Sequence, residues 1–325
     1  MLKNAFFKLI IYIVFILRRF MKVLFLGSSH FSKVVLEKML DSGINVSCVI
    51  TQPDKPSGRG HKFLPTEVNV FAREKGIDVK TFDKIKLHIE EIKEIDFDIS
   101  VVASFGQILP NSFLDLKLCI NVHPSLLPKY RGASPIQTTI LNGDEETGVT
   151  IMKVAQAVDS GDIIIQKRIE LNGEYYKELE EKLGILGGEM ICEVINNYEK
   201  GKIEFTPQDH EKAILVQKFN KEDGKLDFGN LPKDLVNRVR ALSETIGTYF
   251  FIDDMLVKVE RLQDVSGECQ VEQGFILNNK KRFVIGCKDG AVEVCSCKAP
   301  SGKTVSGRDF INGHNNLLSK KVNNA

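Results

Sequence analysis

The chain of 325 residues contains no tryptophan, and its seven cysteines show no regular spacing. An odd number of cysteines argues against a disulfide framework and indicates a reducing compartment, so we expect a cytoplasmic protein. Cys295 and Cys297 are expected on one face of a strand, with Cys287 nearby in the sequence. Because no CxxC motif or pair of histidines completes a zinc site there, we expect ordinary strand cysteines and no bound metal.

The sequence also lacks a strong charge of either sign. Its formal net charge is +1, and the first twenty residues carry four basic residues and no acidic ones, so residues 21–325 sum to −3. This balance argues against indiscriminate binding to nucleic acid, which needs a broadly basic surface. From Leu215 to the end, 17 basic residues outnumber 14 acidic ones. A polyanion would therefore bind a local basic surface in this part.

The apolar run at residues 9–17 is too short to cross a membrane, since nine residues cannot span a bilayer core that needs about twenty. Arg18, Arg19 and Phe20 follow it, where a signal peptide would have small residues. Met21 then begins a clean strand pattern. Residues 1–20 are interpreted as an upstream extension of a chain whose natural start is Met21, with a membrane anchor as the alternative; no membrane contact is otherwise expected.

Strand-length apolar segments alternate with helix-period segments from residue 21 to about 171, which is typical of a parallel-rich α/β sheet covered by helices. The expected strands cover residues 22–26, 45–51, 99–103 and 118–122, and the expected helices 31–40 and 67–75. In such sheets, ligands bind beyond the carboxyl ends of the strands. The first turn, residues 27–32, lacks the glycines of a GxGxxG motif, so no dinucleotide cofactor is expected.

The second half of the chain has a different pattern. A strand pair is expected at residues 149–154 and 163–169, followed by a long amphipathic helix at 175–198. Looser polar sequence then precedes a helix with Asn230 as its cap and Pro232 in its first turn. Short alternating runs follow and predict a small, OB-like β-barrel. The runs are residues 248–252, 256–261, 274–277, 283–286 and 291–297.

An amide, an imidazole and a carboxylate lie at the ends of strand-like segments, as Asn121, His123 and Asp159. Acyl transfer to an amine requires donors for the developing oxyanion and a group that removes the proton of the amine. Asn121 and His123 can donate to the oxyanion, and Asp159 can accept the proton or hold the imidazole in one tautomer. Each residue alone also fits a structural role, so it is their combination that indicates acyl transfer.

Six short segments carry a family resemblance. They are Asn121-Val122-His123 with Ser125-Leu126-Leu127-Pro128, and residues 130–133, 135–137, 147–150 and 159–162. Together they closely resemble the folate-dependent formyltransferase family, and the resemblance extends from about Met21 to beyond Phe310. It implies a Rossmann-like catalytic domain, 10-formyltetrahydrofolate as formyl donor, no metal, and Asn121, His123 and Asp159 as catalytic residues. It also implies a folate site lined by Ser125, Leu126, Leu127 and Pro128.

Residues 51–62 contain Lys55, Arg59 and Lys62 in a Gly/Pro-rich segment, which by its chemistry alone fits a solvated surface loop. The segment resembles the mobile loop of the tRNA-specific members of the family, which reaches towards the acceptor end. The resemblance implies that these three residues bind charged initiator tRNA, and that the chain formylates the methionine of this tRNA in translation initiation. It implies no stable protein partner. The alternatives are a formyltransferase acting on an amino sugar nucleotide or another small amine, and a non-catalytic tRNA-binding protein.

The chain departs from the family pattern at two places. Pro124 stands where many relatives have glycine, and residues 241–248 replace the usual Asn-Pro-Trp-Pro stretch. We expect an extension at residues 1–20, a formyltransferase catalytic domain at 21–208, a linker region at 209–227 and a C-terminal β-barrel domain that binds tRNA at 228–318.

Overall fold

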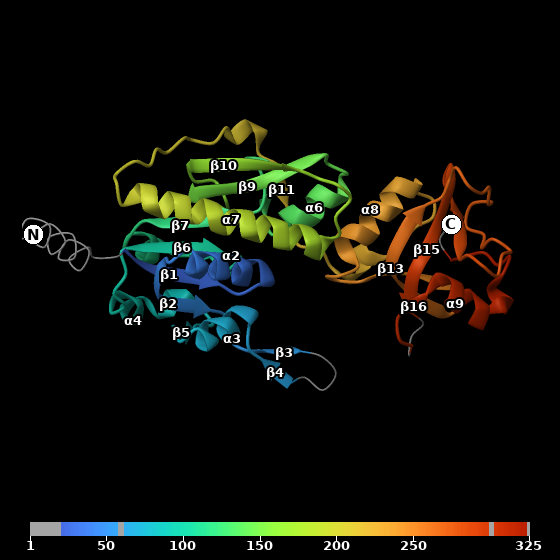
Figure 1. Ribbon diagram of the computed structural model, residues 1–325, viewed down its shortest axis with the longest axis horizontal. Helices are drawn as coiled ribbons and strands as arrows, with labels where there is room; N and C mark the ends of the chain where they lie inside the picture. The colour runs from blue at the N-terminus through green and yellow to red at the C-terminus, as the bar shows by residue number, and fades with distance from the viewer. Residues whose placement is uncertain (1–20, 58–61, 299–301, 324–325) are drawn as a thin grey trace, which may run out of the picture. The chain divides into compact units, whose positions relative to one another are not determined.

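The computed structural model describes residues 21–57, 62–298 and 302–323 (Figure 1). The predicted extension at residues 1–20 lies outside this described part. The chain divides into two compact units, and each contains several stretches of sequence. The first unit comprises Met1–His123, Thr150–Gln166 and Gly184–Gln208, and the second comprises Pro124–Val149, Lys167–Leu183 and Asp209–Ala325.

The main sheet has seven strands in the order β10-β9-β7-β6-β1-β2-β5. Their bounds are β1 Lys22–Gly27, β2 Asn45–Thr51, β5 Asp78–Thr81, β6 Ile99–Ala103, β7 Cys119–His123, β9 Glu146–Lys153 and β10 Ile163–Glu170. The run from β7 to β5 is parallel throughout, and β9 is antiparallel to β7. The predicted parallel-rich α/β fold is therefore confirmed. Strand β5 was not predicted because it has a single apolar residue, Val79, and thus no apolar run.

Helices accompany this sheet because an interior strand is apolar on both faces: Val23, Leu24, Phe25 and Leu26 of β1 are fully buried. The helices of the first unit, with one 3₁₀ turn, are α2 His30–Asp41, α3 Glu67–Glu74, η1 Ile85–Leu87, α4 Ile89–Lys93, α5 Asn111–Leu114 and the C-terminal part of α7 Tyr176–Tyr198. Figure 1 shows α7 running alongside α2. Gly184 of α7 allows this approach, since a Cβ there would lie 2.8 Å from Val34 Cγ1 of α2.

The second unit contains a small antiparallel sheet in the order β12-β13-β15-β14, with β16 paired to β15. Its strands are β12 Thr248–Ile252, β13 Met255–Asp264, β14 Val284–Cys287, β15 Gly290–Lys298 and β16 Val305–Ser306. Phe228, Phe250 and Phe283 are fully buried in its core. Helix α9 Gly307–Gly313 and the 3₁₀ turn η4 Asn315–Leu317 follow the sheet. The predicted small C-terminal β domain is thus confirmed as an antiparallel sheet.

Other parts of the second unit come from the middle of the chain. Strand β8 Arg131–Gly132 pairs in parallel with β11 Leu215–Val216. The remaining elements are α6 Pro135–Leu141, α8 Pro232–Leu242 and the 3₁₀ turns η2 His210–Lys212 and η3 Lys221–Gly224. Helix α6 packs near α8, where a Cβ on Gly143 would lie 2.9 Å from Asn237 Nδ2. The segment predicted as a linker, residues 209–227, therefore includes short regular elements.

Three local predictions were wrong. Leu231, not Asn230, is the N-cap of α8, because the Asn230 side chain instead donates to the Asp227 carbonyl in the preceding turn. Cys295 is exposed whereas Cys297 is buried, since the pairing of β13 with β15 is irregular at this point and rotates the two residues apart. Residues 274–277 make isolated bridges to two different partner segments rather than one strand.

A polar cluster occupies the segment that replaces the tryptophan-containing stretch. Glu244 accepts a hydrogen bond from the backbone N–H of Lys177, at 2.9 Å, in the first turn of α7. Its other oxygen lies 3.3 Å from Arg261 Nη2. The Arg261 guanidinium lies 3.5 Å from the centre of the Tyr175 ring. Within the second unit, an acid at a helix N-terminus and a stacked cation thus join α7 to β13.

Glu244→Ala is expected to lower the free energy of unfolding by about 1–2 kcal/mol, because it removes a helix-terminal acceptor and an ion pair together. Urea denaturation measures this value. Glu146→Ala is the matched control, since its pair with Arg168 is exposed on both sides, and such pairs contribute less than about 1 kcal/mol. If Glu244→Ala costs no more than Glu146→Ala, the cluster does not stabilise the unit.

Candidate active site

Strand β7 places Asn121 and His123 two residues apart, and therefore on one face, at the carboxyl end of the parallel sheet. Val122, between them, points to the opposite face and is buried. His123 is registered against Thr150 of β9. Asp159 lies in the loop that connects β9 to β10. All three predicted residues belong to the first unit, so their positions relative to one another are defined within that unit.

The structure brings Asn121, His123 and Asp159 into one cluster. His123 Nδ1 lies 3.6 Å from Asp159 Oδ2, and the side chains are 5% and 15% exposed. Asn121 Nδ2 donates to Asp159 Oδ1 across 3.5 Å. The cluster thus combines a carboxylate that can accept a proton with an amide and an imidazole side chain that can donate to an oxyanion.

The loop that carries Asp159 has a constrained backbone. Asp159 has φ = 47°, in the left-handed region. Gly161 approaches β9 so closely that a Cβ would lie 1.8 Å from the Lys153 carbonyl oxygen, and Lys153 N donates to the Asp162 carbonyl at 2.9 Å. The Gln208 side chain also contacts this loop. Our sequence interpretation missed Gln208, because it stands 49 positions from Asp159 in a segment that showed no motif.

The predicted folate segment, Ser125–Pro128, follows β7 after Pro124 and belongs to the second unit. Ser125 Oγ donates to the Lys129 carbonyl at 2.6 Å. Leu127 is buried and precedes Pro128 through a cis peptide bond. Leu126 approaches Gly148, where a Cβ would lie 2.6 Å from Leu126 Cδ2. Several contacts thus fix this short segment within its own unit.

The predicted tRNA-binding loop is only partly described. Strands β3 Lys55–Ser57 and β4 Lys62–Leu64 form an antiparallel hairpin, and Arg59 falls in the interval 58–61, outside the described residues. Phe63 and Leu64 at the end of the hairpin are 68% and 52% exposed. The roles predicted for Lys55, Arg59 and Lys62 stay predictions.

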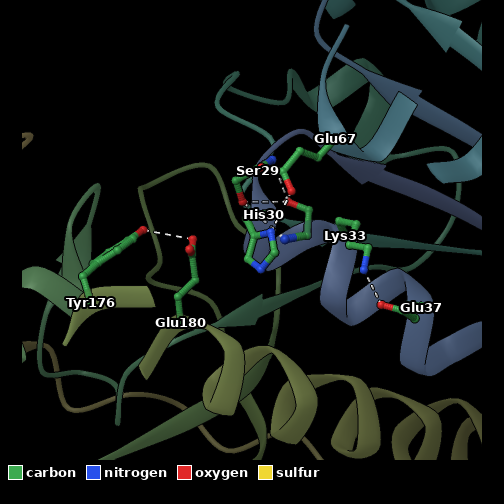
Figure 2. Close-up of polar contacts among 8 residues, drawn as sticks. Ser29, His30, Lys33, Glu37, Glu67, Tyr176 and Glu180 are labelled. Atoms are coloured by element: carbon green, nitrogen blue, oxygen red, sulfur yellow. Dashed lines mark hydrogen bonds and ion pairs between the residues drawn. The ribbon is translucent and has the colours of Figure 1, made fainter. Parts of the chain in front are cut away.

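The first turn, which lacks the glycines of a nucleotide-binding motif, is closed by its own side chains. Ser29 is the N-cap of α2, and its hydroxyl accepts a hydrogen bond from the backbone N–H of Ser32. The Ser32 hydroxyl in turn accepts one from the backbone N–H of Ser29. Figure 2 shows His30 pointing towards Glu67, with Nδ1 and Oε2 2.7 Å apart. The same view shows the Lys33–Glu37 ion pair one turn further along α2. Serine hydroxyls therefore satisfy the Ser32 amide in the first turn of this helix and the Ser28 and Ser29 amides just before it.

The buried cysteines are poor nucleophiles. Burial raises the pKa of the Cys119 thiol to about 12, and burial together with the nearby Glu260 raises that of Cys297 to about 12. Both thiols therefore stay protonated at neutral pH. Among the described residues, no group of three or more His, Cys, Asp or Glu side chains is arranged to hold a metal ion. No helix in the same part of the chain is long and apolar enough to cross a membrane.

Comparisons with known proteins identify the family of the chain. The formyl transferase family matches residues 21–217, and the family of formyl transferase C-terminal domains matches residues 218–315. The methionyl-tRNA formyltransferase of Geotalea daltonii is 35% identical over 308 residues, which cover 93% of this chain and 98% of that protein. The methionyl-tRNA formyltransferase of Sulfurihydrogenibium sp. is 37% identical over 302 residues, covering 90% of this chain and 97% of that protein.

Solved structures share the fold at lower identity. HypX from Aquifex aeolicus, in complex with tetrahydrofolic acid, has a TM-score of 0.67 at 16% identity; 93% of this chain is covered, but it spans about half (49%) of the HypX chain. The N-formyltransferase from Helicobacter canadensis, in complex with folinic acid and dTDP-3-aminofucose, has a TM-score of 0.63 at 20% identity, covering 84% of this chain and 98% of that one. With both family matches together spanning most of its length, the chain belongs to the formyl transferase family.

Proposed function

We propose that this chain is a cytoplasmic enzyme that transfers the formyl group of 10-formyltetrahydrofolate to the α-amine of methionine on charged initiator tRNA. The observation that carries the proposal is the cluster of Asn121, His123 and Asp159 at the carboxyl end of the sheet. The choice of tRNA is supported by relatives that match nearly the whole chain and are named methionyl-tRNA formyltransferases.

In the proposed reaction, the neutral amine attacks the formyl carbon and a new carbon–nitrogen bond forms. Asn121 and His123 donate hydrogen bonds to the oxyanion of the tetrahedral intermediate. Asp159 orients His123 and accepts or relays the proton that leaves the amine. The bond between the formyl carbon and N10 of the folate then breaks, and N10 takes up a proton. One formyl group and, in net terms, one proton have then exchanged places.

We place the folate at the segment Ser125–Pro128. Its support is the local structure: Ser125, Leu126 and Leu127 are held by contacts within their own unit, and a fixed segment can bind a planar ring without first being ordered. Only Pro124 separates this segment from the end of β7, so it begins two residues after His123.

A direct comparison of three amines tests the proposal. We expect a kcat/KM for charged initiator tRNA at least about 10³-fold above that for free methionine, because contacts with the remote parts of a substrate contribute to positioning its amine. An amino sugar nucleotide such as dTDP-3-aminofucose should react no better than methionine. A higher kcat/KM for the sugar would move the assignment to small amines, and tRNA binding without any formyl transfer would indicate a non-catalytic protein.

Basic residues of the second unit differ in their availability for tRNA. Three arginines are already engaged: Arg238 donates to the Asp223 carbonyl at 2.6 Å, and Arg240 to the Glu174 carbonyl at 2.9 Å. Arg282 pairs with Glu268 and Glu293. By contrast, Lys280 and Lys281 are exposed in a turn. We therefore propose these lysines as phosphate contacts.

Arg59→Ala and the double variant Lys280→Ala/Lys281→Ala should change different kinetic parameters of the reaction with tRNA. Loss of the two lysines should raise the KM for tRNA without changing kcat. The salt dependence of this KM should become weaker, by the amount expected for the loss of about two phosphate contacts. Loss of Arg59 should lower kcat as well, by about 10-fold or more, because a loop that positions the acceptor end acts in the transition state. Steady-state kinetics across a salt series separates the two effects. If Arg59→Ala changes neither parameter, the loop has been misassigned.

A further inference from the structure

The carboxylate of Asp159 depends on a loop whose backbone is held by a distant side chain. Gln208 Nε2 donates to the Asp159 carbonyl at 2.9 Å and to the Gly161 carbonyl at 2.7 Å. Gln208 is 5% exposed, and its amide also lies 3.8 Å from Met152 Sδ of β9. One buried amide therefore bridges the two carbonyls on either side of Ser160.

Backbone pairing fixes Gln208 itself. Two residues before it, Thr206 and Ile163 exchange both backbone hydrogen bonds, each 2.8 Å long. Ile163 begins β10, directly after the Asp159 loop. The segment ending at Gln208 is thus tied to the far end of the same loop. All these residues belong to the first unit.

The loop has a physical need for this contact. Asp159 has φ = 47°, a conformation that costs energy for a residue other than glycine and persists only where its surroundings enforce it. A buried carbonyl without a donor is also unfavourable, and two carbonyls that share one donor group would lose it together. Without the amide, the loop would relax and carry the carboxylate away from its neighbours.

We propose that Gln208 is a positioning residue that orients the Asp159 carboxylate towards His123 and Asn121. The inference rests on the proposed function of these three residues. Gln208 donates to main-chain oxygens and acts through Asp159, so its contribution belongs to the alignment of the reacting groups rather than to substrate binding. Small displacements of a catalytic group reduce the rate without an equal effect on affinity.

Gln208→Met removes the donor and keeps the length of the side chain. Turnover should fall by about 10-fold or more, with each KM changed by less than about threefold, because alignment of the reacting groups matters most in the transition state. Gln208→Glu, which keeps the shape, serves as a second variant with the same expectation. The matched control is Gln107→Met: Gln107 also bridges two backbone groups of the first unit, Phe82 O and Ile85 N, at 2.7 and 2.8 Å. It should keep kcat. A loss of kcat equal to that of the control would overturn the proposal.

A double-mutant cycle separates positioning from general destabilisation. If Gln208 acts through Asp159, the effect of Gln208→Met on single-turnover rate should disappear in an Asp159→Asn background, because no carboxylate remains to be oriented. The same fold loss in both backgrounds would show that Gln208 does not act through Asp159, and the proposal would be wrong.

Amide hydrogen exchange in the absence of substrate tests the contact independently of the reaction. Gln208→Met should speed the exchange of amides in residues 157–163, and Gln107→Met should not. Unchanged exchange would overturn the proposal. The two proposals can fail separately. If wild-type protein formylates an amino sugar nucleotide rather than tRNA, the proposed function is wrong, but faster exchange in Gln208→Met would still support the contact. The double-mutant cycle would then be measured with the amino sugar nucleotide as substrate.

Discussion

Asp159→Asn is expected to lower turnover by about 10² or more, in the range found when a general acid–base group is lost. Asparagine keeps the size of the side chain and can still contact His123, which lies 3.6 Å from Asp159. It cannot accept the proton that leaves the amine. The KM for the folate should stay within about threefold, because the loss falls on the transition state. Single-turnover transfer from labelled donor measures the rate.

Asp162→Asn is the control for this variant. It removes a carboxylate from the same loop three positions later, where the backbone carbonyl of Asp162 accepts from Lys153. We expect it to stay within about threefold of wild type, since the bond that ties this residue to β9 is made by its backbone carbonyl, which the substitution keeps. Near-normal turnover in Asp159→Asn would reject the role proposed for this carboxylate.

Asn121→Ala should reduce kcat by about 10²-fold, as expected when one of the donors to an oxyanion is removed. The side chain amide is the group affected, because β7 keeps its backbone pairing to β6 regardless of residue type. Since the same amide donates to Asp159 across 3.5 Å, part of the loss should come from a less well oriented carboxylate. Titration with the folate measures whether donor binding persists, as we expect.

Asn69→Ala provides the matched control. Asn69 is a buried asparagine of the same unit that accepts from Arg73 Nε at 2.7 Å within α3. Its removal should destabilise the protein and leave kcat within about twofold of wild type. If Asn121→Ala and Asn69→Ala had equal turnover, Asn121 would have no part in stabilising the oxyanion.

The elements predicted correctly are those with strong local patterns. Strand β1 contains an unbroken apolar run, and the segments with the 3.6-residue apolar period form the helices α2 and α7. The juxtaposition of Asn121 with His123 follows from the two-residue period of β7. Their closeness to Asp159 required the resemblance to a family, because 38 residues separate Asn121 from Asp159 and no local rule brings them together.

The features that escaped prediction depend on tertiary pairing. Gln208 reaches the Asp159 loop through the pairing of Thr206 with Ile163. No periodicity in the sequence predicts this pairing. Asn230 has the right residue type for a helix cap, but a competing turn takes its side chain. Cys295 and Cys297 separate because of an irregular register between β13 and β15, which depends on both strands at once.

The most direct test of the central claim follows the formyl group itself. Donor labelled in the formyl carbon would be incubated with charged initiator tRNA and dTDP-3-aminofucose together, and the methionine and the sugar would then be recovered separately. We expect label on the α-amine of methionine, at a rate that falls by about 10² or more in Asp159→Asn. Label on the sugar, or label on methionine at an equal rate in both proteins, would contradict the central claim.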